Sequence, residues 1–351
     1  MTIDNPLERG FLDRDVISDR DGRIWTILGH IQPKKRVIAF LKYVPDESGQ
    51  WSRRGARFRR IFWGGVQSVI NGMTRLPSEY LYDDPHFGTV IPSVPIQNIA
   101  EHYRPEVRFK EITDLGARDP LEEKAVKLAE VLSDSAGIRL ESFGVAGSLA
   151  WRAHDPNRSD INLCIYGFDN SWRLQEAYEQ IPEVDDRISL RENRNWLAAK
   201  SRIVSRVPTV GIEDIHPLFE RRRALYLANQ CIGVTPILRT HEAPIHYMSE
   251  RYEDVSSEPI RTIFNVHDAS YGLFLPSLYL GESDRLDSID GQSASRLMLY
   301  EGAFRGLAKV GDRLEVAATL QRVVKSSDES TFYQLMVGTK TGAGSEYIRL
   351  L

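Results

Sequence analysis

The sequence predicts a multidomain α+β protein with three successive parts, which are β-rich, α/β and β-rich. Strand-like alternation of apolar residues fills roughly the first 110 residues and returns in the last hundred, whereas helical periodicity is confined to the middle. A chain of 351 residues can form two or three domains, each with its own core. We therefore expect an N-terminal β-rich domain over residues 1–115, an α/β domain over 116–250 and a C-terminal β domain, a small barrel or sandwich, over 251–351.

The composition excludes several classes of protein. The chain carries 45 Lys and Arg against 49 Asp and Glu, a net charge of −4, and is 42% apolar, as expected of a soluble globular protein. No apolar run approaches the roughly 20 residues that span a bilayer, and the start of the chain has no basic-then-apolar layout of a secretory signal. The two cysteines, Cys164 and Cys231, stand in apolar surroundings and fit a reducing compartment. We expect a cytoplasmic protein without a membrane partner.

Strand and turn signals are clear at both ends of the chain. Arg23–Gly29 and Arg36–Val44 are β-rich runs, and the turn His30–Lys35 between them predicts a hairpin. Near the C-terminus, apolar residues alternate over Leu314–Leu320 and again over Tyr333–Val337, which indicates the strands of the C-terminal domain.

A basic segment follows the first hairpin. Trp51–Arg75 contains six arginines and no acid, interleaved with four aromatic residues. Arginine with aromatics suits a nucleic-acid backbone or stacked bases, but such a run is also typical of a solvated strand whose arginine stems cover apolar surface. Both interpretations stay open. The candidate nucleic-acid contacts are Arg57, Arg59 and Arg60 here, and Arg221 and Arg222 in a basic, helix-like region over Arg187–Arg223.

The middle of the chain begins with a well-marked helix. Asp119 is placed as its N-cap, Pro120 as its first residue and Glu122 as the third residue of a capping box, and Gly137 is a C-terminal stop. One apolar stripe follows at helical spacing, namely Leu121, Ala125, Leu128 and Leu132. The elements expected after it are strands over Ser142–Arg152, Asp160–Tyr166 and Cys231–Thr240, and helices over Ser171–Ile181 and from Pro217 to Asn229.

The segment Gly144–Gly167 carries the residues that suggest chemistry. Gly147 and Ser148 lie at a tight turn, where glycine lets backbone N–H groups approach phosphate oxygens. Asp160 and Asn162 stand two residues apart on a predicted strand, so their side chains share one face while the apolar residues between them enter a core. Oxygen ligands at this position suit Mg²⁺, which also binds the phosphates of a substrate.

This pattern of Gly-Ser, about ten residues and Asp-apolar-acid resembles the signature of the polymerase-β-type nucleotidyltransferase superfamily. More narrowly, the chain resembles a family of predicted archaeal nucleotidyltransferases, a likeness that covers most of its length. The matching segments outside the motif are Arg36–Pro45, His102–Ile112, Asp119–Leu132, Phe274–Glu282 and Gly311–Val316. The resemblance implies that Gly147 and Ser148 bind the phosphates of a nucleoside triphosphate. It also implies that Asp160 ligates Mg²⁺ and that Asn162 occupies the second catalytic position.

The chain departs from that family pattern at two points. Asn162 replaces the second aspartate of the motif, and an amide oxygen brings no charge to a cation. The resemblance also implies a third carboxylate on a later strand, but Cys231–Thr240 contains no acid, and Glu242 is the first acid after it. Asp185, Asp186 and Asp214 are substitutes only in a different topology.

Two functions of different classes follow. One is metal-dependent transfer of a nucleotidyl group from a nucleoside triphosphate to an acceptor hydroxyl, with Mg²⁺ as cofactor. The other is a degenerate nucleotidyltransferase fold, a pseudoenzyme that binds nucleotide, RNA or DNA. Retention of the fold for assembly is a third reading. The sequence indicates no oligomeric state.

Other motifs predict ordinary structure. The chain has no P-loop pattern and no nucleophile elbow. His241 and His246 are five residues apart with Pro244 between them, which does not suit a zinc helix. His154 lies beside a turn, where a hydrogen bond is the expected role. Cys164 is expected to pack in the core.

Overall fold

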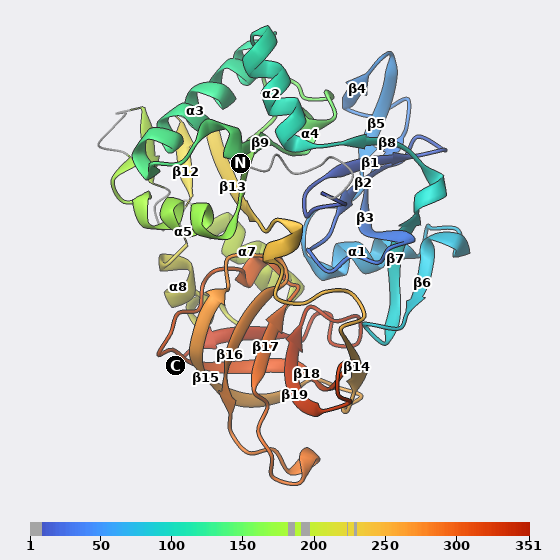
Figure 1. Ribbon diagram of the computed structural model, residues 1–351, viewed down its shortest axis with the longest axis vertical. Helices are drawn as coiled ribbons and strands as arrows, with labels where there is room; N and C mark the ends of the chain where they lie inside the picture. The colour runs from blue at the N-terminus through green and yellow to red at the C-terminus, as the bar shows by residue number, and fades with distance from the viewer. Residues whose placement is uncertain (1–8, 182–186, 191–196, 223, 228–229) are drawn as a thin grey trace.

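The computed structural model describes residues 9–181, 187–190, 197–222, 224–227 and 230–351 of the chain. Three β-sheets follow one another along the sequence, and most of the helices gather around the second (Figure 1). The protein is therefore a multidomain α+β protein, and the predicted order β, α/β, β is confirmed at this level. Within the described part of the chain, no helix has both the length and the apolar character needed to cross a membrane.

The N-terminal sheet has eight strands in the order β4-β5-β3-β2-β1-β8, with β7 joining β3 to β6. The predicted hairpin is confirmed, because β2 and β3 pair antiparallel across the turn at 30–35. The strands are β1 Val16–Asp19, β2 Ile24–Ile27, β3 Arg36–Pro45, β4 Trp51–Arg53, β5 Ala56–Arg60, β6 Leu81–Asp84, β7 Thr89–Pro95 and β8 Ile99–Tyr103. Two 3₁₀ turns, η1 Ser78–Tyr80 and η2 Ile96–Asn98, complete this part.

One helix of the N-terminal part was not predicted. The helix α1, Gly65–Met73, follows β5 and is bounded by Gly64 at its start. Its apolar residues Val66, Val69, Ile70 and Met73 recur at helical spacing, but the helix has only nine residues and begins with glycine. Such a short run without a side-chain cap is a weak helix signal.

The second sheet has the order β11-β12-β13-β10-β9. Its strands are β9 Phe143–Val145, β10 Ile161–Tyr166, β11 Ile188–Leu190, β12 Leu225–Leu227 and β13 Gln230–Ile237. The strands β10 and β13 are parallel and the other pairs are antiparallel. Apolar residues of α2 Pro105–Leu115, α3 Pro120–Ala136 and α5 Phe168–Ala177 pack against the sheet in one core.

The signals for α3 are confirmed, with one difference. Asp119 accepts hydrogen bonds from the backbone N–H groups of Leu121 and Glu122, and Gly137 ends the helix with a φ of 61°. The carboxylate of Glu122 does not close a capping box on Asp119. It accepts from the backbone N–H of Arg118 and forms an ion pair with Arg108 of α2 instead.

Three other expectations are corrected. The strand expected over Ser142–Arg152 ends at Val145, because Gly147 has a φ of 63° and turns the chain into the short helix α4, Gly147–Ala150. Pro217 lies inside helix α8, Ile212–Glu220, and does not start it. The start of that helix is stabilised by Asp214, whose carboxylate accepts a hydrogen bond from the backbone N–H of Gly211. Part of the helix expected before Asn229 is strand β12, although residues 223 and 228–229 lie outside the described residues.

The third sheet closes into a five-stranded barrel through the pairs β18–β15, β15–β16, β16–β17, β17–β19 and β19–β18. Its strands are β15 Ile260–Tyr271, β16 Ser277–Ser283, β17 Arg296–Leu299, β18 Arg313–Lys325 and β19 Thr331–Val337. Two further strands, β14 Glu250–Asp254 and β20 Tyr347–Leu350, pair with β18. Short 3₁₀ turns are η3 Leu140–Ser142, η5 Thr240–Glu242, η6 Asp287–Ile289 and η7 Gly302–Phe304. Of the two predicted alternatives for this domain, a barrel and a sandwich, the structure shows the barrel.

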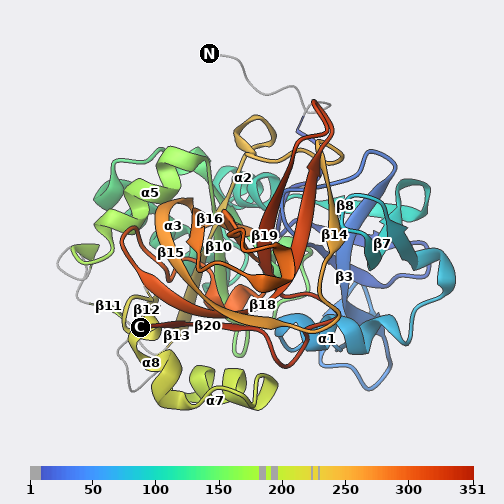
Figure 2. The same cartoon turned by 90° about the horizontal axis from the view of Figure 1, so that it is seen from below.

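Packing crosses both expected domain boundaries. Phe109 and Ile112 of α2 belong to the core of the second sheet, before residue 116. Ile203 of α7, Leu197–Arg206, and Phe219 of α8 belong to the barrel core, before residue 251. Figure 2 shows α8 beside β20 at the edge of the barrel, and these two elements are in contact. Apolar stripes at these helices predict burial, but the pattern does not say against which sheet.

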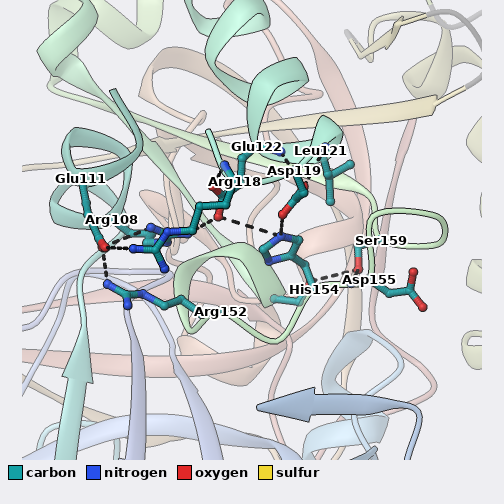
Figure 3. A network of polar contacts seen from close by, with 11 residues as sticks. Arg108, Glu111, Arg118, Asp119, Leu121, Glu122, Arg152, His154, Asp155 and Ser159 are labelled. Atoms are coloured by element: carbon teal, nitrogen blue, oxygen red, sulfur yellow. Dashed lines mark hydrogen bonds and ion pairs between the residues drawn. The ribbon is translucent and has the colours of Figure 1, made fainter. Parts of the chain in front are cut away.

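A polar network ties α2 and α3 to the loop that precedes β10 (Figure 3). The ion pair of Arg108 with Glu122 lies at its centre, with side chains only 5% and 1% exposed. Glu111 of α2 binds Arg108, Arg118 and Arg152. On the other side, His154 Nε2 lies 2.8 Å from Asp119 Oδ2. The start of the loop before β10 is therefore attached to the network at two residues, Arg152 and His154.

We expect Glu122→Ala to lower the free energy of unfolding by up to about 3–5 kcal/mol, because it removes the buried partner of the Arg108 guanidinium and leaves only the more exposed Glu111 to pair with it. Urea unfolding followed by circular dichroism measures this loss. Glu123→Ala, on the exposed side of the same helical turn, serves as the matched control and should change stability by less than about 0.5 kcal/mol. Equal effects of the two substitutions would contradict a central role for the pair.

Candidate functional site

Asp160, directly before β10, and Asn162, within it, line one cleft. Both side chains are exposed, whereas Ile161 and Leu163 between and beyond them are fully buried against the helices. This alternation is the one expected from the sequence. Cys164, the next residue on the face of Asn162, is buried, and burial raises the pKa of its thiol. The thiol therefore packs as an apolar group and is not a nucleophile.

Two glycines flank the side chain of Asn162. The backbone N–H of Ala146 donates to the carbonyl of Asn162 at 2.8 Å, which sets the start of α4 against β10. A Cβ on Gly147 would lie 3.5 Å from Asn162 Nδ2, and one on Gly233 of β13 would lie 3.1 Å from Asn162 Oδ1. Ser148 reaches the same cleft through its hydroxyl, which donates to Ser159 at 3.3 Å. The structure thus brings Gly147, Ser148, Asp160 and Asn162 together.

No third carboxylate joins Asp160 from β13, whose described residue opposite Asn162 is Gly233. Glu242 lies beside Gly167, past the far end of β10. Tyr166 lies six steps along the chain from Asp160, about 20 Å at roughly 3.3 Å per residue. Asp214 caps α8 and pairs with Arg349. Asp185 and Asp186 lie outside the described residues.

Cations from the N-terminal sheet face this cleft. A cavity of about 340 Å³ is lined by all four motif residues and also by Arg14, Lys42 of β3, Arg60 of β5 and Arg158. Its described acids are Asp160 and Asp155, and Asp155 already accepts from Arg158 at 2.7 Å and from the backbone N–H of Asn157. Positive charge therefore exceeds negative charge around the motif.

Lys42 is the residue of this cleft that sequence reasoning missed. It is the single charged residue in the otherwise apolar run from Val37 to Val44. A lone charge in such a strand is the sequence feature that could have indicated a functional residue. Burial, together with the nearby Arg60 and Arg14, lowers the pKa of Lys42 to about 7. Burial also raises the pKa of the neighbouring Tyr43 to about 12, and Asp160 contributes to that rise.

The five predicted nucleic-acid contacts do not form one surface. Arg60 lines the cleft, but Arg57 and Arg59 alternate with it on β5 and are exposed on the other face. Arg59 pairs with Asp46 at 2.6 Å, and Arg57 donates to the carbonyl of Gly49. Arg221 and Arg222 line a second cavity, of about 280 Å³, that also reaches Asp160 and Asn162. Arg221 pairs there with Asp312.

A group of metal-ligating residue types lies outside this cleft. Ligand atoms of Asp119, Glu122 and His154 stand within 4.8 Å of one another. The oxygens of Asp119 cap α3 and meet His154, and Glu122 is paired with Arg108. Although burial raises the pKa of Asp119, the bonds from His154 and the helix N–H groups lower it more strongly. This is the hydrogen-bonded turn expected for His154, and its charges are balanced without an ion.

Fold and cleft together define a multidomain α+β protein with a cation-rich cleft between its first two sheets. No protein-family model matches the chain, and no solved structure matches it. The chain is 25% identical over 349 residues to the uncharacterized protein MJ1086 of Methanocaldococcus jannaschii, covering 96% of this chain and 98% of that protein. The similarity extends over all three parts and brings no assigned activity.

The lowered pKa of Lys42 predicts a pH-dependent contribution to stability. Between about pH 7 and pH 10 the unfolded chain holds a proton on Lys42 that the folded chain has released. Stability attributable to this residue should therefore rise with pH across that window. Urea unfolding at pH 6.5 and pH 9 of the natural protein and of Lys42→Met measures the effect, because the other groups titrate alike in both. A stability difference that is unchanged between the two pH values would contradict it.

Proposed function

We propose that the second sheet and its helices form a nucleotidyltransferase-like domain that binds the phosphate chain of a nucleoside triphosphate without transferring its nucleotidyl group. The observation that carries this proposal is the composition of the cleft. Gly147, Ser148 and Asp160 line it together with Arg14, Lys42 and Arg60. A triphosphate needs its negative charge balanced, and here side-chain cations outnumber carboxylates.

The donor set of the motif does not fit two magnesium ions. Mg²⁺ prefers carboxylate and phosphate oxygens in near-octahedral geometry. Asp160 supplies one carboxylate, Asn162 supplies a neutral amide, and Gly233 stands where β13 faces them. Nearby cations oppose a divalent ion further. Arginine and lysine can meet phosphate oxygens directly through charge-assisted hydrogen bonds, so binding does not depend on the metal.

Metal-dependent nucleotidyl transfer to an acceptor hydroxyl is the second candidate function. It is favoured by the presence of Gly147, Ser148 and Asp160 in one cleft. In that case Asp160 would be the main metal ligand. Binding of RNA or DNA would use the same cations, but the separation of Arg57 and Arg59 from Arg60 gives no continuous track along an extended strand.

Calorimetric titration with each of the four nucleoside triphosphates, with and without Mg²⁺, tests the binding proposal. We expect binding without metal and a loss of roughly tenfold or more in Arg60→Gln, since a charge-assisted hydrogen bond contributes about 1.5–3 kcal/mol. The matched control is Arg59→Gln, one residue away on the opposite face of β5, which should bind within twofold of the natural protein. Absence of binding to any triphosphate, or equal loss in both variants, would overturn the proposal.

A transfer assay separates the two candidate functions. Labelled triphosphates are incubated with Mg²⁺ or Mn²⁺, with and without RNA or DNA, using the natural protein, Asp160→Ala and Asn162→Asp. We expect no transfer by the natural protein, and in Asn162→Asp a triphosphate affinity that becomes stronger with Mg²⁺, because the substitution restores a carboxylate. Transfer by the natural protein that disappears in Asp160→Ala would establish the enzyme and refute binding alone.

A further inference from the structure

A third cavity, larger than the two described above, lies between the N-terminal sheet, α1 and the barrel. Its volume of about 450 Å³ falls within the roughly 300–1,000 Å³ typical of small-molecule sites. Figures 1 and 2 both show α1 beside β3 and close to the barrel. The apolar walls come from two elements of the N-terminal part and one of the barrel, and include Ile38 and Phe40 of β3, Val69 and Ile70 of α1, and Met336 of β19.

The apolar stripe of α1 faces this cavity. Val66, Val69, Ile70 and Met73 all line it, and the first three are only half-buried. An apolar stripe on a helix normally packs against a core. Here the stripe and β3 enclose space large enough for an apolar molecule. Val66 is also tied to the barrel, because its backbone N–H donates to Glu301 Oε2 at 2.9 Å.

Three guanidinium groups stand where this cavity adjoins the other two. Arg222 and Arg305 line both the large cavity and the 280 Å³ cavity, and Arg14 lines both the large cavity and the motif cleft. Arg305 forms no hydrogen bond or ion pair with the described residues, and its Nη1 is completely buried. Burial and the neighbouring Arg14 lower its pKa to about 10. The Nε of Arg14 is also buried without a hydrogen bond, 3.5 Å from Asp13.

Among the described residues no carboxylate forms an ion pair with Arg305, although the buried Asp13 pairs with Arg14 at 3.5 Å and opposes the lowering of the pKa of Arg305. Glu301 accepts from the backbone N–H groups of Val66 and Ala303. Asp254 accepts from the side chain of Gln321. Arg305 is half-buried with its Nη1 fully buried, and removing a cation from water without a partner is unfavourable, so an anion entering beside Arg305 would reduce that cost.

We propose that this cavity binds an elongated apolar molecule that carries one anionic head group, a carboxylate or a phosphate. The apolar chain lies between α1, β3 and the barrel, and the head group meets Arg305, with Arg14 and Arg222 adjacent. An inorganic anion would leave the apolar walls in contact with water. A neutral apolar molecule would leave Arg305 without a partner. The site adjoins the proposed nucleotide cleft at Arg14, but the proposal does not rest on nucleotide binding.

Calorimetric titration of the full chain with decanoate, decyl phosphate, decanol and inorganic phosphate tests this proposal. We expect both decyl anions to bind and decanol to bind at least tenfold more weakly, and the stronger of the two anions identifies the head group. Shortening the chain should weaken binding by roughly fourfold per methylene removed. Failure of both decyl anions to bind, or equal binding of decanol, would overturn the proposal.

Matched variants assign the binding to this cavity. Arg305→Gln should weaken decyl-anion binding at least tenfold and leave decanol unchanged, whereas Arg313→Gln, an exposed cation of the same barrel, should have no effect. Val69→Trp should fill the cavity and prevent binding, and Asn71→Trp, on the exposed face of the same helix, should not. Triphosphate binding and circular dichroism of Val69→Trp show whether the protein is folded, since Val69 does not line the nucleotide cleft. Unchanged decyl-anion binding in both Arg305→Gln and Val69→Trp would refute the site.

Discussion

The main physical constraint on this structure is positive charge that is partly removed from water where the three parts of the protein meet. Arg14, Lys42 and Arg305 come from three segments of the chain and lie at the cavities between the sheets. Burying a cation without a partner costs free energy, and the lowered pKa values of Lys42 and Arg305 express that cost. An anion bound at this junction would offset that cost, which is why both proposed ligands carry negative charge.

The neighbouring polar network has the opposite character, because its charges are balanced. Arg108 and Glu122 form an ion pair in the interior, and His154 meets Asp119, the cap of α3. Together they hold the loop before β10 and so set where Asp160 emerges. A cluster of histidine and acids outside the cleft thus serves packing, whereas the less conspicuous Lys42 and Arg305 face the cavities. The network residues and the cavity-lining cations are therefore told apart by whether each charged group has a partner, and not by residue type.

The two proposed sites adjoin each other at the arginines. Arg14 lines both the motif cleft and the apolar cavity, and Arg305 lines the apolar cavity and the space beside Asp160 and Asn162. Occupation of one site by an anion would therefore change the electrostatic potential at the other. Two bound anions would repel each other, and arginines lying between them would reduce that repulsion by contacting both.

The sequence by itself determined the order of the three parts, the limits of α3, the hairpin β2–β3 and the shared face of Asp160 and Asn162, because caps, turns and alternation are local signals. It also showed that Asn162 lacks the charge of an aspartate. Only the tertiary structure decided that Gly233 stands opposite Asn162, that α8 packs on the barrel and that Lys42, Arg14 and Arg305 converge. Those facts depend on strand register and on the packing of segments far apart in the chain, and no local pattern encodes which cations meet or whether a carboxylate lies among them.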